Sequence, residues 1–262
     1  MRKGNLLIMA LIAGLLGVIF MSLVPAPDGP EPVTATPTPA PPAAPDTEVE
    51  RYPIATATPS SQTDLPANPD DSDSAYGDGL QQLVGAEALA YFHSDRMIRR
   101  FVATIDNLPR QEAPARMMPV KPVGGPFLVE RNAAQMTIDP ANDGRYARYL
   151  EIMAAVDVKR LVDMYIGFYP VLQQAYRELG YPRGHFNDRL VDTLDDLLAT
   201  PDVAPPLALA QPKVLYKFAD PALEKRSAGQ KIMLRMGADN MARAKRLLSA
   251  IRSELLSRSP GK

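Results

Sequence analysis

Two pairs of residues in the sequence could take part in catalysis. Ser227 and Lys231 are four positions apart, and a desolvated Lys can act as the base for a Ser nucleophile. His185 lies close to Asp188, and a carboxylate can orient an imidazole that acts as a base. Both pairs are also ordinary surface combinations, and no oxyanion donors can be identified near them. We therefore predict no catalytic residue in this chain.

Three carboxylates, Asp192, Asp195 and Asp196, fall on neighbouring turns of a predicted helix. Such a group could share a proton or bind a hard cation. It also suits the solvated face of an amphipathic helix, and nothing around it resembles a calcium loop. With no Cys and only two His residues, a thiolate or histidine metal centre is not expected either. The sequence thus predicts neither a metal site nor a cofactor.

Basic residues are the candidates for binding a partner. Arg99 and Arg100 lie off the apolar face of a predicted helix, and Arg is enriched at the energetic centres of interfaces. We predict a contact surface there, with ion pairs to the Asp-rich helix as the alternative. Residues 225–262 carry ten Lys or Arg against two acidic residues, which suits anionic lipid headgroups but lacks the aromatic pattern of nucleic-acid binding. The binding residues predicted in this region are Lys225, Arg226, Lys231 and Arg235.

Residues 1–24 have the composition of a membrane anchor. Nineteen uncharged residues, Leu6–Val24, follow Arg2 and Lys3. At ~1.5 Å per residue, such a helix crosses a hydrocarbon layer of ~30 Å. A cleaved signal peptide usually has a shorter apolar region, of about 7–15 residues. We predict an uncleaved, single-pass anchor with Met1 in the cytoplasm, because basic residues tend to stay on that side.

The next segment, residues 25–78, has the composition of a linker. Thirteen of the 27 Pro residues lie between Pro25 and Pro69, and residues 25–79 carry ten Asp or Glu against one Arg. Pro-rich repeats favour extended polyproline geometry, and like charges repel one another. We predict a disordered, acidic spacer between the anchor and a folded domain at residues 79–262.

Residues 79–262 show the pattern of a mostly helical domain. Apolar residues recur at helical spacing through much of it, most clearly in residues 187–198. The short apolar runs Phe127–Val129 and Met136–Ile138 predict a small hairpin, and Val214–Phe218 is the one other strand signal. The predicted fold class is therefore mainly α, a membrane-anchored helical domain with a minor β hairpin.

Aromatic residues are concentrated in the stretch Tyr165–Phe186. In a chain without Trp, six of the seventeen Tyr and Phe residues lie there. Large aromatic side chains bury much apolar surface, so we predict the centre of the core in this stretch. Pro170 removes a backbone hydrogen bond from a helix, which predicts a kink or break near Phe168. The residues predicted to be buried are Tyr165, Phe168, Tyr169 and Tyr176.

Several blocks of the sequence resemble a known family. They are IRRFVATIDNLPR at residues 98–110, NDGRYARY at 142–149, YPVLQQAYRELGYP at 169–182, FNDRLVDTLDDLLATP at 186–201 and QPKVLYKFADPALEKRSAGQKIMLRMG at 211–237. Together they resemble the bacterial domain of unknown function 3014, over roughly residues 80–256. The resemblance implies a bacterial envelope protein with an N-terminal anchor and one folded domain. Together with the uncharged run and the basic residues before it, this predicts an anchor in the inner membrane and a domain in the periplasm. It carries no activity, cofactor or catalytic residue over to this chain.

Three hypotheses for the function follow. The first is a non-catalytic, membrane-tethered module that binds an envelope protein or polymer. The second is a domain that binds a lipid or another small ligand in an aromatic pocket, and the third is a hydrolase of envelope polymers. A cavity among the Tyr and Phe residues would favour the second, whereas an exposed apolar patch would favour a protein partner.

Overall fold

The computed structural model of the chain describes residues 49–54, 68–132 and 135–259. The predicted anchor, Leu6–Val24, and most of the predicted linker lie outside these residues. None of the helices that the described residues form is long and apolar enough to cross a membrane. The structure therefore concerns the domain that we expected to follow the linker.

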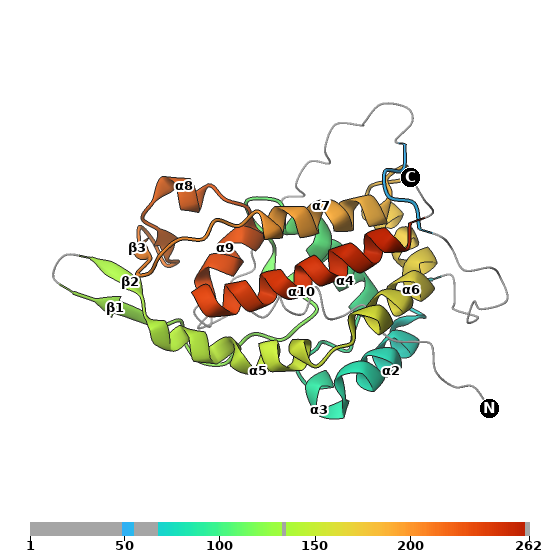
Figure 1. Ribbon diagram of the computed structural model, residues 1–262, viewed down its shortest axis with the longest axis horizontal. Coiled ribbons are helices and arrows are strands. Elements are labelled where there is room, and N and C mark those ends of the chain that lie inside the picture. The colour runs from blue at the N-terminus through green and yellow to red at the C-terminus, as the bar shows by residue number, and fades with distance from the viewer. Residues whose placement is uncertain (1–48, 55–67, 133–134, 260–262) are drawn as a thin grey trace.

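Helices dominate the described residues, as the sequence predicts (Figure 1). They are α2 (Asp73–Val84), α3 (Ala86–Leu89), α4 (Met97–Asn107), α5 (Asp143–Ala154), α6 (Val158–Glu178), α7 (Phe186–Leu198), α8 (Pro221–Glu224), α9 (Ala228–Arg235) and α10 (Ala238–Ser257). Two short 3-10 turns are η3 (Ala115–Met117) and η4 (Pro140–Asn142). The mainly α class is therefore confirmed.

The β element is larger than the predicted hairpin. Its strands are β1 (Val129–Arg131), β2 (Met136–Ile138), β3 (Ala208–Ala210) and β4 (Lys217–Phe218). They follow one another in the order β1–β2–β3–β4, and every pair of neighbours is antiparallel. The register pairs Met136 with Leu209 and Leu209 with Phe218, so apolar residues of three strands share one face.

Of the three predicted strands, Met136–Ile138 pairs in the sheet over its full length, and the other two pair only in part. The first begins at Val129, after Phe127, and of the run Val214–Phe218 only Lys217 and Phe218 form a strand. Val214 and Leu215 are instead 68% and 47% exposed, in the loop between β3 and β4. The neighbouring strand β3 is only three residues long. Its pairing with this run ends at Lys217 and does not extend to Val214 and Leu215.

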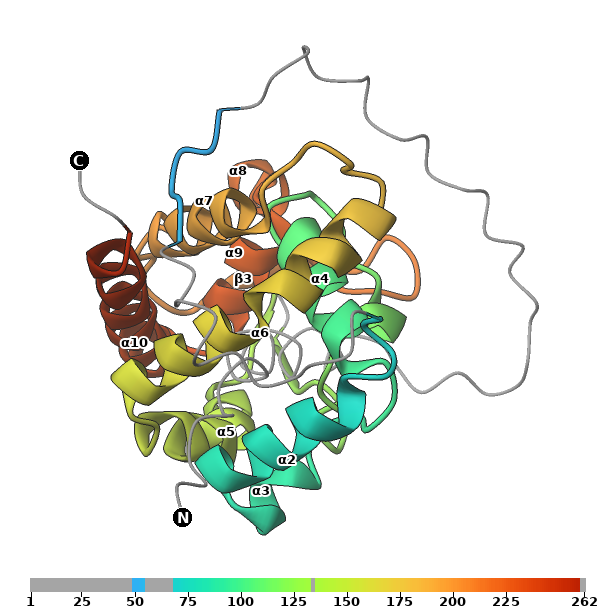
Figure 2. The same cartoon turned by 90° about the vertical axis from the view of Figure 1, so that its right-hand side faces the viewer.

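Helix α6 is the centre of the core, as the aromatic stretch predicts. It lies between α4 and α10 and contacts both (Figure 2). Phe168 meets Tyr76 of α2 edge to face, with 5.5 Å between the ring centroids. The four aromatic residues predicted to be buried are indeed buried, and they are Tyr165, Phe168, Tyr169 and Tyr176.

The break predicted near Phe168 is wrong, whereas the predicted kink stays a prediction. Helix α6 continues from Val158 to Glu178 with Pro170 inside it. Pro170 lies on the exposed side of the helix, where the carbonyl that loses its hydrogen bond can reach water. On the opposite side, Val171 and Leu172 are buried, so packing on the core supports the helix where the hydrogen bond is lost.

The folded part of the chain begins before residue 79. Helix α2 starts at Asp73, and its residues Tyr76 and Leu80 are fully buried. Residues 49–54 also belong to the fold, because they are hydrogen-bonded to α7. Two parts of the predicted linker (residues 25–78) are therefore held on the domain, and they are residues 49–54 and 68–78. The rest of the predicted linker lies outside the described residues.

Candidate functional site

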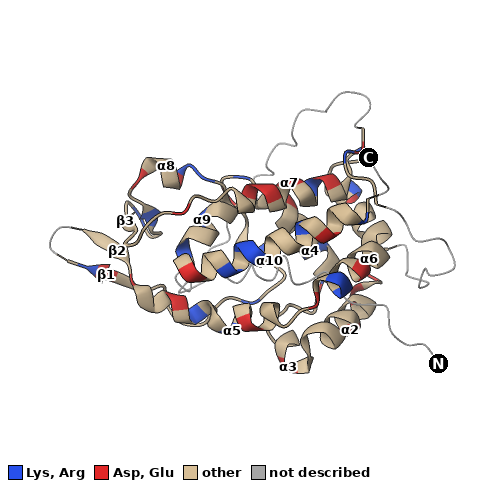
Figure 3. Ribbon diagram, in the orientation of Figure 1, with Lys and Arg blue, Asp and Glu red and all other residues tan. Residues whose placement is uncertain are grey.

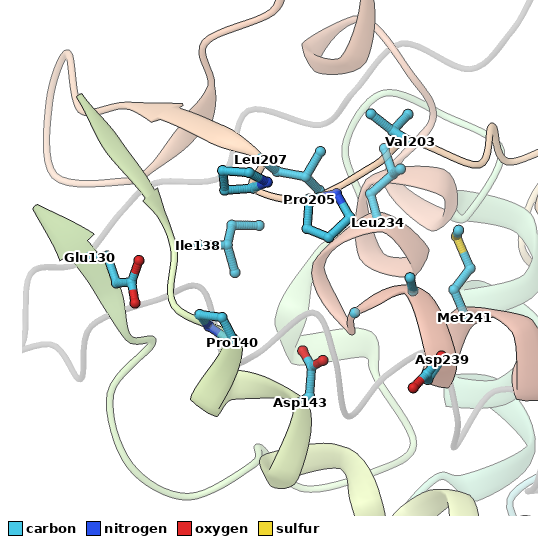
Figure 4. Close-up of a pocket in the computed structure, with 13 residues that line it drawn as sticks. Glu130, Ile138, Pro140, Asp143, Val203, Pro205, Leu207, Leu234, Asp239 and Met241 are labelled. Carbon is cyan, nitrogen blue, oxygen red and sulfur yellow. The ribbon is translucent and has the colours of Figure 1, made fainter. Parts of the chain in front are cut away.

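A pocket of about 530 Å³ lies between the sheet and the beginning of α10 (Figure 4). Pockets that bind small ligands usually have volumes of about 300–1,000 Å³, so this one has room for a ligand. Its walls are mainly aliphatic and proline side chains. These are Ile138, Pro140, Val203, Pro205, Pro206, Leu207, Leu234 and Met241.

Three carboxylates border the pocket. Asp143 comes from the first turn of α5, Asp239 from the first turn of α10, and Glu130 from β1 (Figure 4). No Lys or Arg is among the described residues that line it. Burial raises the pKa of the Asp143 carboxyl above its usual value, and the nearby charge of Asp239 adds to this. The pocket thus combines apolar walls with acidic groups.

Gly237 allows Asp143 to lie against the start of α10. Its φ of 88° is in the left-handed region, which side-chain-bearing residues rarely adopt. A Cβ at this position would also collide with the Asp143 carboxylate. Both the turn between α9 and α10 and the place of Asp143 therefore depend on a glycine here.

Two buried asparagines fix the elements around the pocket. The Asn142 side chain accepts a hydrogen bond from the Leu128 amide at 3.0 Å and donates to the Leu128 carbonyl at 2.7 Å. The Asn240 side chain donates to the carbonyls of Asp143, at 3.0 Å, and Met236, at 2.8 Å. Because buried amides need such partners, these bonds hold the start of α5 against α10 and against the residue that precedes β1.

The two arginines predicted as a contact surface form ion pairs within the domain. Arg99 pairs with Asp70 at 2.8 Å and with Glu178 at 2.6 Å. Arg100 pairs with Asp95 at 2.8 Å and donates to two backbone carbonyls of the loop that contains η3. The intramolecular alternative placed their partners on the Asp-rich helix α7. The structure places them before α4 and at the end of α6 instead.

The basic residues predicted near the C-terminus have different environments. Arg235 is 5% exposed, and its guanidinium carbon lies 4.5 Å from the centroid of the Phe218 ring. Burial lowers the pKa of Arg235 to about 10, and this side chain faces the interior rather than solvent. Lys231 is mostly covered, whereas Lys225 is exposed and Arg226 partly so. In Figure 3 the ribbon of α10 has several Lys or Arg positions, and that of the neighbouring helix α7 has several acidic positions.

Ser227 and Lys231 have separate structural partners. Ser227 is the N-cap of α9, since its hydroxyl accepts a hydrogen bond from the Gln230 amide at 3.1 Å. The same hydroxyl donates to the Asp196 carboxylate at 2.6 Å. Lys231 Nζ lies 3.7 Å from the carboxylate of Glu224. The Ser hydroxyl is therefore bonded to a carboxylate of α7 and not to Lys231, the base of the predicted pair.

The other acidic residues of α7 are also paired rather than only solvated. Asp195 forms an ion pair with Arg252 of α10. Asp192 forms one with Arg51, which belongs to the segment of residues 49–54. His185 Nδ1 lies 3.7 Å from the Glu50 carboxylate of that segment. In the described ranges, no three His, Asp or Glu side chains are grouped so that they could hold a metal ion.

Comparison with known families gives one match. The model of the family described as protein of unknown function DUF3014 matches residues 97–252. The chain belongs to this family. The matched DUF3014 region runs from the start of α4 into the last turns of α10, and it contains every residue that lines the pocket. Helix α2 and residues 49–54 precede it. No curated protein and no solved structure matches the chain.

Proposed function

We propose that this DUF3014 protein is a non-catalytic binding module of the bacterial cell envelope. In this proposal Leu6–Val24 anchors it in the inner membrane, and the periplasmic domain holds a partner protein through the pocket between the sheet and α10. The observation that carries the binding role is the pocket itself, with its volume of about 530 Å³ and its apolar walls. Anionic lipid headgroups near the exposed Arg243 and Arg246 of α10 are a further proposed contact.

The chemistry of the pocket favours an apolar segment that carries a positive charge. Aliphatic walls gain free energy when they are removed from water by an apolar ligand. The carboxylates of Asp143, Asp239 and Glu130 would attract an ammonium or guanidinium group and repel an anion. We therefore propose that the pocket takes a Lys or Arg side chain of the partner, together with the apolar residues beside it.

The aromatic-pocket alternative has less support in the geometry. Rings of the aromatic stretch pack against one another, as in the stacked pair Tyr176 and Tyr181, whose centroids are 4.5 Å apart. The pocket lies elsewhere, and the described residues that line it include no aromatic residue. The hydrolase alternative relied on carboxylates or on the pair Ser227 and Lys231. Ser227 and Lys231 serve as a helix cap and an ion-pair partner. The three carboxylates of α7, Asp192, Asp195 and Asp196, have Arg51, Arg252 and Ser227 as partners.

The test is a titration of the full chain in detergent micelles, followed by NMR. The probes are acetyl-Leu-Lys-Leu-amide and its neutral counterpart acetyl-Leu-Gln-Leu-amide. We expect the Lys peptide to bind about tenfold more tightly, because only its ammonium group can pair with the carboxylates. Replacement of both pocket acids, Asp143→Asn and Asp239→Asn, should remove this preference.

Glu151→Gln is the matched control, since Glu151 is an exposed carboxylate of α5 that does not line the pocket. The Lys-peptide preference should also fall as the pH is lowered, beginning above the ordinary Asp pKa of about 3.9, because the pKa of Asp143 is raised. If the double variant does not fold, the single variant Asp239→Asn replaces it in this test, because Asp239 is exposed. Equal binding of the two peptides to the unmodified chain would overturn the proposed ligand.

A further inference from the structure

Residues 49–54, called the docking segment below, lie against the beginning of α7 (Figure 2, blue). The Asp188 carboxylate accepts hydrogen bonds from two consecutive backbone amides, those of Arg51 at 3.0 Å and Tyr52 at 2.9 Å. The neighbouring Asn187 side chain donates to the Tyr52 carbonyl at 2.6 Å. Two adjacent side chains of α7 thus bind three backbone groups of the docking segment.

Side chains add specificity to this backbone recognition. The Arg51 guanidinium donates to both carboxylate oxygens of Asp192, at 3.0 and 2.6 Å. Such a two-bond contact is geometrically selective for Arg. Glu50 lies 3.7 Å from His185, and Ile54 packs against the main hydrophobic core. Every residue from Glu50 to Ile54 except Pro53 therefore has a named contact with the domain.

The core holds the receiving side chains in place. The Tyr165 hydroxyl donates to Asn187 Oδ1 at 2.9 Å, which leaves the Asn187 amide group free to face the docking segment. Burial raises the pKa of Tyr165 well above its usual value, so the hydroxyl stays protonated and remains a donor. Gln173 accepts from the Phe186 amide at 2.8 Å and donates to the carbonyl before His185, which fixes the first turn of α7.

We propose that the first two turns of α7 form a peptide-binding site for the docking segment, and that docking there is reversible. The ligand is a short segment with the sequence Glu-Arg-Tyr-Pro, recognised through its backbone and its Arg. Asn187 and Asp188 are buried, but the side-chain contact that makes the site selective is open to solvent, and docking is therefore reversible. The side chains of Arg51 and Asp192 are 53% and 41% exposed, and ion pairs as open as this contribute little.

Reversible docking would set how far the domain can move. Twenty-four residues separate Val24 from Val49, and fully extended they reach about 75 Å at ~3.1 Å per residue. When the docking segment is released, the chain before α2 has 48 residues after Val24 and reaches about 150 Å. This change of reach rests on the proposed anchor, whereas the docking site itself does not.

The test measures the distance between two spin labels in the full chain by pulsed electron resonance. The chain has no Cys, so Val49→Cys and Leu179→Cys, both at exposed positions, introduce the only labelling sites. We expect one narrow distance for the docked state and a broad minor population for the released state. Arg51→Gln, which changes only the docking segment, should raise the released fraction about two- to fivefold, as expected for the loss of an exposed ion pair. Asp188→Ala should do the same.

Competition and a matched control complete the test. The peptide acetyl-Val-Glu-Arg-Tyr-Pro-Ile-amide, added at millimolar concentration, should raise the released fraction, and the same peptide with Gln in place of Arg should be much weaker. Asp163→Asn removes an acid of α6 that pairs with Arg258, and it should leave the distances unchanged. A narrow distance that neither Arg51→Gln nor the peptide alters would overturn reversible docking. A broad distribution in the unmodified chain would overturn the site.

Discussion

Replacing Phe168 by Ala should lower the free energy of unfolding by about 3–5 kcal/mol, the usual loss for a large buried aromatic side chain. Phe168 is 1% exposed and packs edge to face on Tyr76, at 5.5 Å between centroids and 87° between planes. It therefore joins α2 to α6, two helices that lie far apart in the sequence. Its removal would leave a cavity at the centre of the core, which the surrounding helices cannot close without moving.

Urea unfolding of the full chain, followed by circular dichroism, measures this loss. Leu179→Ala is the matched control, because Leu179 follows the end of the same helix and is 40% exposed. We expect a loss of less than about 1 kcal/mol for the control. A loss that small for Phe168→Ala would mean that α6 is not the centre of the core.

The second large effect should come from Asp106→Asn, with a loss of about 3 kcal/mol in the free energy of unfolding. Asp106 is 3% exposed and accepts hydrogen bonds from Arg110 at 2.8 Å and from the Tyr181 hydroxyl at 3.2 Å. Arg189 Nε lies 3.1 Å from its other oxygen, as an ion pair that is not aligned for a hydrogen bond. Neutralising this carboxylate would leave two arginines without their shared counter-charge.

Asp163→Asn is the matched control for Asp106→Asn, because it removes a paired carboxylate that is exposed rather than buried. Asp163 pairs with Arg258 at 2.8 Å, but its side chain is 55% exposed. Exposed ion pairs contribute about 0–1 kcal/mol, so the control should be nearly neutral. Equal losses for the two variants in thermal and urea unfolding would show that the Asp106 cluster does not hold α4, α7 and the loop between α6 and α7 together.

The parts of the fold that depend on local sequence were predictable. Apolar residues at helical spacing identify α7, and the density of Tyr and Phe identifies the core around Phe168. Pro170 was misleading because its effect depends on which side of the helix it faces. On the exposed side of α6 the lost hydrogen bond has water as a substitute, and that side cannot be read from the proline itself.

The candidate site could not be predicted because its residues come from distant segments. Pocket residues run from Glu130 to Met241 in sequence, and the Pro-rich connection before β3 resembles an ordinary loop. Asp143 looks like any acidic residue in the first turn of a helix. Gly237 was a local signal for the end of a helix. That it also leaves room for the Asp143 carboxylate can be seen only in the structure.

The docking segment was missed for a different reason. Composition places it within an acidic, Pro-rich linker, and composition reports how much apolar surface a segment could bury. Residues 49–54 are held mainly by hydrogen bonds to Asp188 and Asn187, which composition does not report. The carboxylates of α7 likewise suggested a solvated face, although Asp192 and Asp195 both have arginine partners.

The central claim is that the domain works by binding a partner in the pocket beside α10. Photo-crosslinking in intact bacterial membranes tests it most directly, with benzoylphenylalanine placed in the full chain at Ala238, an exposed residue that lines the pocket. Leu179, 40% exposed and not among the lining residues, is the control position. We predict a defined protein adduct from Ala238 that Asp143→Asn with Asp239→Asn abolishes and Glu151→Gln preserves. No adduct from Ala238, or one that persists when both pocket acids are replaced, would contradict the account.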